Sequence, residues 1–408
     1  MRRVLTPSNI ASTAIIAAVA AMVVVANVRD ARRSRAAYTR PDVIGTRVAK
    51  TTRADLTRRI EDLRQRLSRQ PEDLGLALML ADALMRQTRI TGNAGLATEA
   101  EQSLKRALDG DAANYDGNRT LAAIYLSQHR FREAIAAAEK NRLARPSDPL
   151  NYGVIGDGHL ELGDYTEAFD AFDRMMELRP SAAAYARVAY ARELQGNLNG
   201  AVQAMELAAD ATAAEDPEAL AWHQSQLGDL YLRLGKVREA ESAYIAASHS
   251  FPGHPFAVVG YSRVLAARGD LTGALTVLQE LAQDAPTPDL AARIGDLLER
   301  LGRADEAERQ FAIAEAGWRT DAPEPKSLAR FLADRDRKID EAVAIAERAA
   351  AARHDIFTED ALAWAYFKAG RREEARRAIA RALRTGTKDA DILAHARAIG
   401  VPMQAARR

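Results

Sequence analysis

The chain has 408 residues, contains no cysteine and carries a formal net charge of +1 at pH 7. The absence of cysteine excludes disulfides, thiolate metal sites, a cysteine nucleophile and a lipid-modified N-terminal cysteine. The net charge hides an uneven distribution, because residues 1–70 hold 15 Lys or Arg against 5 Asp or Glu, and the remainder is acidic. An acidic body argues against a nucleic-acid groove, so no nucleic-acid partner is predicted.

The N-terminal segment predicts a membrane anchor. Residues 4–28 carry no charge, and residues 10–28 are mostly Ala, Val and Ile, which in a helix is long enough to span a bilayer. A cleaved export signal is the alternative, with a small-residue site at Ala18 and Ala20. The arginines that follow the apolar run favour a retained anchor over residues 1–28. The predicted protein is therefore single-pass, with the body favoured on the cytoplasmic side and an exported body left open.

Two short segments precede the main body of the chain. Residues 29–51 are basic and predict a linker. Residues 52–70 predict an amphipathic helix, because four apolar residues recur at spacings of 4, 3 and 4, namely Leu56, Ile60, Leu63 and Leu67. This helix either caps the body that follows or forms a short self-association seam.

Residues 149–180 form the unit that the rest of the chain repeats. The pattern predicts one helix over residues 150–162 and a second over residues 165–178. Gly163 ends the first helix because glycine readily adopts the left-handed conformation found there, and Pro180 ends the second. Neither helix can bury its apolar stripe alone, so copies must stack to share one core.

Three marks recur in phase along residues 71–387. An alanine opens the second helix at intervals of 33–39 residues, at Ala100, Ala134, Ala168, Ala201, Ala240, Ala274, Ala307, Ala342 and Ala375. A glycine stands five residues before six of them, at Gly163, Gly196, Gly235, Gly269, Gly302 and Gly370. A proline follows four of them by twelve residues. The alanines predict close helix crossings, where a larger side chain would not fit.

The combination of period and marks resembles the tetratricopeptide repeat (TPR) family. Gly156, Ala168, Phe172 and Pro180 carry the resemblance in one copy, and Leu227, Gly228, Tyr231, Ala240, Tyr244 and Pro252 carry it in another. The resemblance implies an all-α, right-handed superhelical solenoid of about nine helix-turn-helix repeats over residues 71–387. Two insertions interrupt the register, QTRITGNAG at residues 87–95 and a longer link at residues 211–217. Residues 388–408 predict a C-terminal capping helix and a tail.

No set of residues for catalysis or metal binding stands out. The seven histidines are scattered and none has a metal-ligand spacing. The glycines of GVIGDG at residues 153–158 lie within a predicted helix, whereas a phosphate-binding loop follows a strand. The sequence therefore predicts no metal, no cofactor and no enzymatic activity.

The resemblance also implies a binding surface, because the first helix of each repeat lines the concave face in the family. Matching positions are occupied by arginines, carboxylates and aromatic residues, which suits an extended peptide carrying both charges. These positions are Arg119, Asp157, Arg187, Tyr190, Gln226, Asp229, Arg263, Arg293, Asp296 and Trp364. The Lys and Asn pattern with which some family members grip a C-terminal carboxylate is absent, so that ligand is not expected.

These observations predict a membrane-tethered scaffold that binds a peptide or a partner protein on the concave face, without chemistry of its own. The alternative is a structural, self-associating protein of the cell envelope. An enzyme or an accessory subunit of one is the third possibility.

Overall fold

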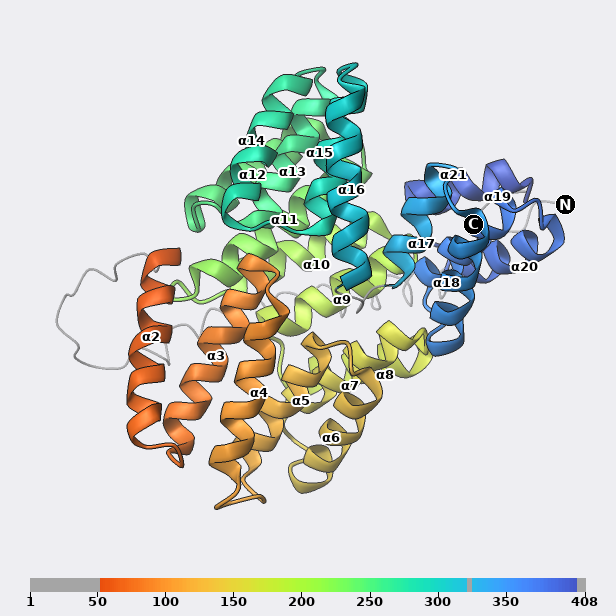
Figure 1. The fold of residues 1–408 in the computed structure, drawn as a ribbon. Helices are drawn as coiled ribbons and strands as arrows, with labels where there is room; N and C mark the ends of the chain where they lie inside the picture. The colour runs from red at the N-terminus through yellow and green to blue at the C-terminus, as the bar shows by residue number, and fades with distance from the viewer. Residues whose placement is uncertain (1–51, 321–324, 402–408) are drawn as a thin grey trace, which may run out of the picture. The chain divides into compact units, whose positions relative to one another are not determined.

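A computed structural model describes residues 52–320 and 325–401 (Figure 1). Within these ranges the chain forms 20 helices and no strand. Nine packed pairs follow one another: α3 (Leu74–Thr91) with α4 (Ala94–Leu108), α5 (Tyr115–Ser127) with α6 (Phe131–Ala144), α7 (Pro149–Leu162) with α8 (Tyr165–Leu178), α9 (Ala182–Leu194) with α10 (Leu198–Ala211), α11 (Pro217–Arg233) with α12 (Val237–Ser250), α13 (Pro255–Ala267) with α14 (Leu271–Asp284), α15 (Pro288–Arg300) with α16 (Ala304–Thr320), α17 (Pro325–Asp334) with α18 (Ile339–Ala352), and α19 (Ile356–Lys368) with α20 (Arg372–Ala382). We call the first member of each pair an A helix and the second a B helix. The prediction of an all-helical repeat array is confirmed.

The pair α7 and α8 shows why the helices begin and end where they do. Asp148 caps α7, because its side chain accepts a hydrogen bond from the backbone N–H of Leu150, and Pro149 occupies the first turn. The helix ends at Gly163, whose φ of 91° lies in the left-handed region. Helix α8 then begins at Tyr165 and buries Ala168, Ala171, Phe172 and Met175.

The small residues of the repeat provide space for packing. All nine register alanines are buried, with exposed fractions of 0–2%, which confirms the predicted close crossings. Four glycines of the A helices face aromatic rings, namely Gly156, Gly228, Gly260 and Gly295: a Cβ built on Gly156 would lie 2.4 Å from the ring of Phe172, and one on Gly260 would lie 2.0 Å from the ring of Tyr244. Each ring therefore fills the space that a missing side chain leaves, and the packing is specific to glycine.

Two helices flank the nine pairs. Helix α2 (Arg53–Arg69) packs on α3, and its four apolar residues Leu56, Ile60, Leu63 and Leu67 are all buried. These side chains belong to the core of the chain, so they are not exposed for the self-association that the sequence left as an alternative. Helix α21 (Ala390–Ile399) packs on α19 and α20 at the other end of the array.

The membrane prediction requires a correction. The longest helix of residues 52–320 and 325–401 is α3, with 18 residues, and it carries charges at Asp82, Arg86 and Arg89. No helix in these ranges is both long enough and apolar enough to cross a bilayer. This finding overturns the predicted single-pass membrane localisation. The predicted anchor over residues 1–28 lies outside the described residues, as does the linker over residues 29–51.

Candidate binding surface on the A helices

All ten predicted site residues lie on A helices. Arg119 is on α5, Asp157 on α7, Arg187 and Tyr190 on α9, Gln226 and Asp229 on α11, Arg263 on α13, Arg293 and Asp296 on α15, and Trp364 on α19. Their arrangement follows from the repeat register, because each aspartate comes directly after the glycine that packs against a B-helix aromatic ring.

Two pairs of predicted residues bind each other across neighbouring repeats. Arg187 donates two hydrogen bonds to Asp157, at 2.9 and 2.5 Å, and both side chains are about one quarter to one third exposed. Arg263 donates to Asp229 at 2.6 Å. In both pairs an arginine contacts the carboxylate of the preceding A helix. These residues therefore connect successive repeats, and their charges are balanced within the chain.

Asp229 makes a second contact, with the hydroxyl of Tyr244 at 2.6 Å. Burial of this tyrosine and the nearby Asp229 carboxylate both raise the pKa of Tyr244 above its usual value of 10.0. The hydroxyl therefore stays protonated and donates its hydrogen to Asp229. The side chain of Arg263 remains 43% exposed beside this pair, so part of its guanidinium is available to another molecule.

Asp296 pairs with Arg335 and not with Arg293 on its own helix. Arg335 lies just after α17 and stacks on two aromatic rings, with its guanidinium carbon 3.8 Å from the ring centre of Phe311 and 4.5 Å from that of Phe331. Arg293 is exposed on α15. The sequence placed Arg293 and Asp296 on one surface, and the structure leaves the arginine accessible there.

Arg119 is held at the start of the next repeat. It donates to Asp148, the capping residue of α7, at 2.9 Å, and it also contacts Asp116. Tyr115 donates its hydroxyl hydrogen to the same Asp148 carboxylate, at 2.9 Å. This arginine therefore joins α5 to α7.

The two aromatic residues of the predicted site are partly covered by the chain itself. The Trp364 indole N–H donates to Asp334 at 2.8 Å, and its ring stacks on His395 of α21 with centres 4.1 Å apart. Tyr190 packs against the largest apolar cluster. Burial raises the pKa of Tyr190 well above its usual value, and nearby carboxylates, including Glu161 and Glu193, add to this effect.

Three large apolar residues that the sequence analysis did not name are exposed on A helices, namely Met79, Leu150 and Phe256. Phe256, in the first turn of α13, is 43% exposed. It occupies the same register position as Trp222 on α11, which is half-buried. Extending the repeat register to this position could have identified it from the sequence. Phe256 and Arg263 on α13, and Arg293 and Asp296 on α15, are exposed.

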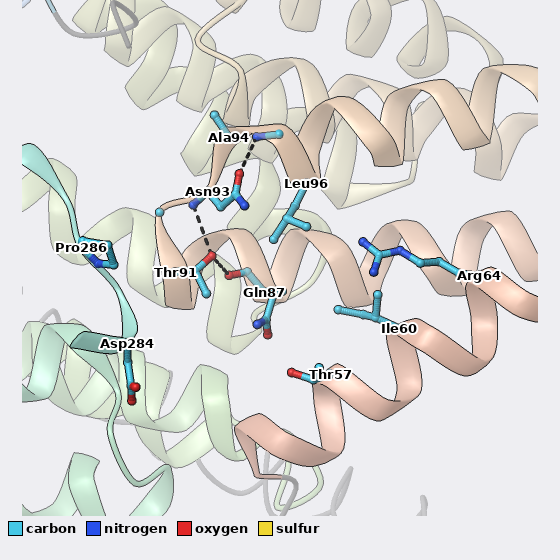
Figure 2. A pocket seen from close by; sticks show the side chains of 12 residues that line it. Thr57, Ile60, Arg64, Gln87, Thr91, Asn93, Ala94, Leu96, Asp284 and Pro286 are labelled. Atoms are coloured by element: carbon cyan, nitrogen blue, oxygen red, sulfur yellow. Dashed lines mark hydrogen bonds between the residues drawn. The ribbon is translucent and has the colours of Figure 1, made fainter. Parts of the chain in front are cut away.

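Metal sites and cavities are the remaining features of the described residues that bear on a functional site. In residues 52–320 and 325–401 no group of three or more His, Asp or Glu side chains could hold a metal ion. A cavity of about 630 Å³ lies between α2, the α3–α4 turn and residues 284–286 (Figure 2). Its lining includes Thr57, Gln87, Asn93 and Asp284, and none of the predicted site residues lines it.

Nine stacked helix pairs with A-helix side chains joined across repeats define a helical repeat solenoid as the class of this protein. Residues 119–182 and 225–290 match the family model described as tetratricopeptide repeat. These segments contain the two copies in which the sequence marks are clearest. The chain is a TPR-like solenoid that contains tetratricopeptide repeats, as the sequence predicted, and such repeats generally mediate protein–protein interaction.

Solved structures support the same fold. A chain of the APC/C hetero-tetramer Cut9-Hcn1 aligns with a TM-score of 0.51 and 15% identity, over 85% of this chain and 59% of that chain. The human IFIT1 dimer with m7Gppp-AAAA aligns with a TM-score of 0.53 and 15% identity, over 82% of this chain and 78% of that chain. No curated protein matches the sequence. At this identity the likeness concerns the fold alone.

Proposed function

We propose that this protein is an interaction scaffold that binds a segment of a partner protein on the A-helix surface of α11, α13 and α15. The observation that carries this proposal is the exposure of Phe256 and Arg263, each 43%, on one A helix. The two residues are seven positions apart on α13, so they lie on one face of the helix, and aromatic residues and arginines are enriched among residues that dominate binding energy.

The charges of this surface define the partner segment. Arg263 on α13 and Arg293 on α15 are exposed. The side chains of Asp229 on α11 and Asp296 on α15 are 31% and 55% exposed. A matching segment carries one apolar residue for Phe256 and acidic residues for the arginines. Three arginines of the predicted site, Arg119, Arg187 and Arg263, are each paired with a carboxylate, which supports a peptide ligand over a phosphate backbone.

The experiment selects peptides that bind the full chain from a random displayed library and measures their affinity by fluorescence anisotropy. The variant Phe256→Ser with Arg293→Glu should weaken binding at least tenfold. The matched control is Ile313→Ser with Arg309→Glu, which likewise changes one large apolar residue and one arginine, on the B helix α16, where both are exposed. The control should change affinity less than twofold. Selected peptides that bind both variants equally would place the binding site elsewhere.

A further inference from the structure

Two of the six register glycines differ from the others in their surroundings. All six have positive φ and lie in the turn between an A and a B helix. A Cβ built on four of them meets nothing within 4 Å, namely Gly235, Gly269, Gly302 and Gly370. A Cβ on Gly163 would lie 2.5 Å from the carbonyl carbon of His354, and one on Gly196 would lie 2.4 Å from the carbonyl oxygen of Gly386. Backbone from the C-terminal repeats therefore contacts these two turns.

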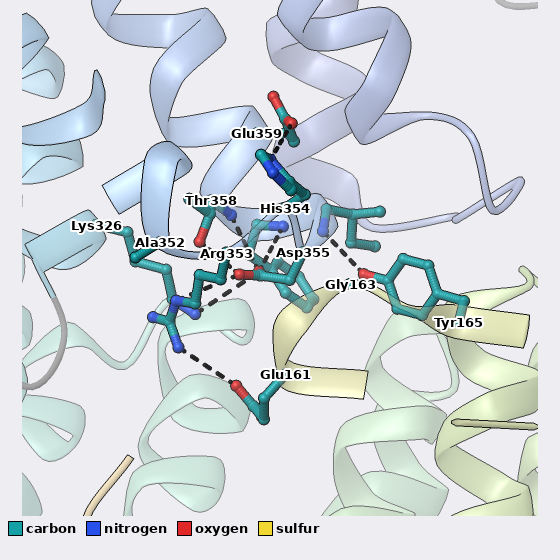
Figure 3. A network of polar contacts seen from close by, with 12 residues as sticks. Glu161, Gly163, Tyr165, Lys326, Ala352, Arg353, His354, Asp355, Thr358 and Glu359 are labelled. Atoms are coloured by element: carbon teal, nitrogen blue, oxygen red, sulfur yellow. Dashed lines mark hydrogen bonds and ion pairs between the residues drawn. The ribbon is translucent and has the colours of Figure 1, made fainter. Parts of the chain in front are cut away.

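At Gly163 the contact consists of directed hydrogen bonds (Figure 3). The N–H of His354 donates to the carbonyl of Leu162 at 2.9 Å, and the N–H of Ile356 donates to the hydroxyl of Tyr165 at 2.8 Å. Arg384 donates to the Gly163 carbonyl at 3.1 Å. The α18–α19 loop is thus bound to the end of α7 and the start of α8.

Buried charges reinforce this contact. Arg353 is 6% exposed and lies 3.5 Å from Glu161 of α7 and 3.5 Å from Asp355. Asp355 is 4% exposed and caps α19 by accepting hydrogen bonds from the N–H groups of Phe357 and Thr358. Lys326 lies 3.7 Å from the same carboxylate. The buried aspartate is therefore stabilised by two cations and a helix N-terminus.

The second contact lies on α9 and α11. Asp389, the capping residue of α21, pairs with Arg233 at 2.7 Å, and Arg233 also contacts Glu193 at 3.0 Å. Glu193 and Arg233 are on A helices. Tyr190, a predicted peptide-binding residue, packs against the apolar cluster that includes Ile356 at the start of α19. The C-terminal segments therefore cover part of the predicted surface.

We propose that residues 353–356 and 384–389 act as an intramolecular ligand of the repeats α7–α11, and that their release exposes the A-helix surface around Tyr190 to a partner. In a stacked array each repeat contacts only its neighbours, and these segments contact repeats about 190 residues away, as in the separation of 191 between Tyr165 and Ile356. The gating of a partner rests on the proposed binding function, whereas the docking of the segments does not.

The test compares two glycine variants by hydrogen exchange in the full chain. Gly163→Ala and Gly269→Ala impose similar backbone strain, because their φ values are 91° and 88°. Only the alanine at position 163 would also collide with the His354 backbone. The amides of His354 and Ile356 should exchange at least tenfold faster in Gly163→Ala and unchanged in Gly269→Ala, with the amides of α8 still protected in both.

Hydroxyl-radical footprinting of Tyr190 provides the second measurement. Its oxidation should rise at least threefold in Gly163→Ala and also in Arg384→Ala, which removes the bond to Gly163 without changing α7. Equal exchange of the His354 and Ile356 amides in both glycine variants would overturn the docking. Release without a rise in Tyr190 oxidation would overturn the gating. Neither measurement needs a partner, so both can succeed or fail independently of the peptide-binding experiment that tests the proposed function.

Discussion

Arg86 donates two hydrogen bonds to Asp216, at 2.6 and 3.2 Å, although 130 residues separate them in the chain. Arg86 lies next to the first insertion of the repeat register, and Asp216 lies in the second. The first insertion extends α3 to 18 residues, whereas the other A helices have 10 to 17. Asp216 caps α11. The two irregularities of the sequence are therefore partners in the structure, and together they join α3 to α11.

Loss of Arg89 should destabilise the protein by about 2 kcal/mol. Arg89 donates two hydrogen bonds to Glu218, whose side chain is 5% exposed. Removing the cation leaves a buried carboxylate without these two charge-assisted hydrogen bonds, which is costly. The exposed pair of Arg66 and Asp62, at 3.5 Å, gives the matched control, and Arg66→Ala should cost less than about 0.5 kcal/mol. Urea unfolding measures the stability of both variants. Equal losses of unfolding free energy in Arg89→Ala and Arg66→Ala would contradict the argument that the buried pair matters more.

The stability of the protein should depend on the ionisation of Glu218. Burial alone would raise the pKa of Glu218, but His254 and Arg89 outweigh that effect and lower it from the usual 4.5 to about 2. A carboxyl whose pKa is lower in the folded state stabilises the fold above pH 4.5, and this contribution disappears as the pH falls towards 2. The difference between these two pKa values corresponds to about 3 kcal/mol of folding stability. Between pH 5 and 2, the unfolding free energy of the parent protein should fall more steeply than that of the Glu218→Gln variant. Parallel curves for the two proteins would refute the lowered pKa of Glu218.

Gly260→Ala should destabilise the protein although alanine favours helices. The ring of Tyr244 on α12 is fully buried and contacts the space at Gly260 on α13, so an added methyl group would overlap it. Overpacking costs about 1–3 kcal/mol, which exceeds the gain in helix propensity of about 1 kcal/mol. Gly110→Ala, where nothing lies within 4 Å, should stay within about 0.5 kcal/mol of the parent. Thermal unfolding measures both, and a stabilised Gly260→Ala would show that the ring can move.

Periodicity predicted the parts of the fold that repeat. The marks at Gly163, Ala168 and Phe172 specify a turn, a close crossing and the ring that fills it, and the structure contains all three. Contacts such as that of Arg86 with Asp216 do not repeat, so a periodic pattern cannot predict them. The insertions indicated where the register changes, but not that the two places meet.

The sequence predicted on which helices the candidate site residues lie, but not which of these residues bind each other. The register put Asp157 and Arg187 on A helices, and the structure places them there. It could not show that the two residues bind each other, because that depends on the offset between neighbouring A helices. Nor could it show that Trp364 stacks on His395 of a helix outside the repeats. Whether these positions bind a peptide stays a prediction.

The final prediction concerns the attachment of α21. His395 of this helix contacts Asp360 of α19 at 2.9 Å, and the two side chains are 9% and 2% exposed. Burial raises the pKa of Asp360, and His395 opposes that rise by binding the carboxylate. In His395→Ala the carboxylate would be buried without this partner, at a cost of about 3 kcal/mol, so α21 should detach before the rest of the array unfolds.

Hydrogen exchange of the α21 amides measures this detachment directly. Arg397→Ala, an exposed change on the same helix, should leave the protection of these amides unchanged. The double variant Asp360→Leu with His395→Leu should recover most of the protection, because it removes the buried charge together with its partner. Recovery would show that the unpaired carboxylate is the cause of the loss. Protection that stays low in the double variant would instead assign the loss to the stacking of His395 on Trp364, at 4.1 Å.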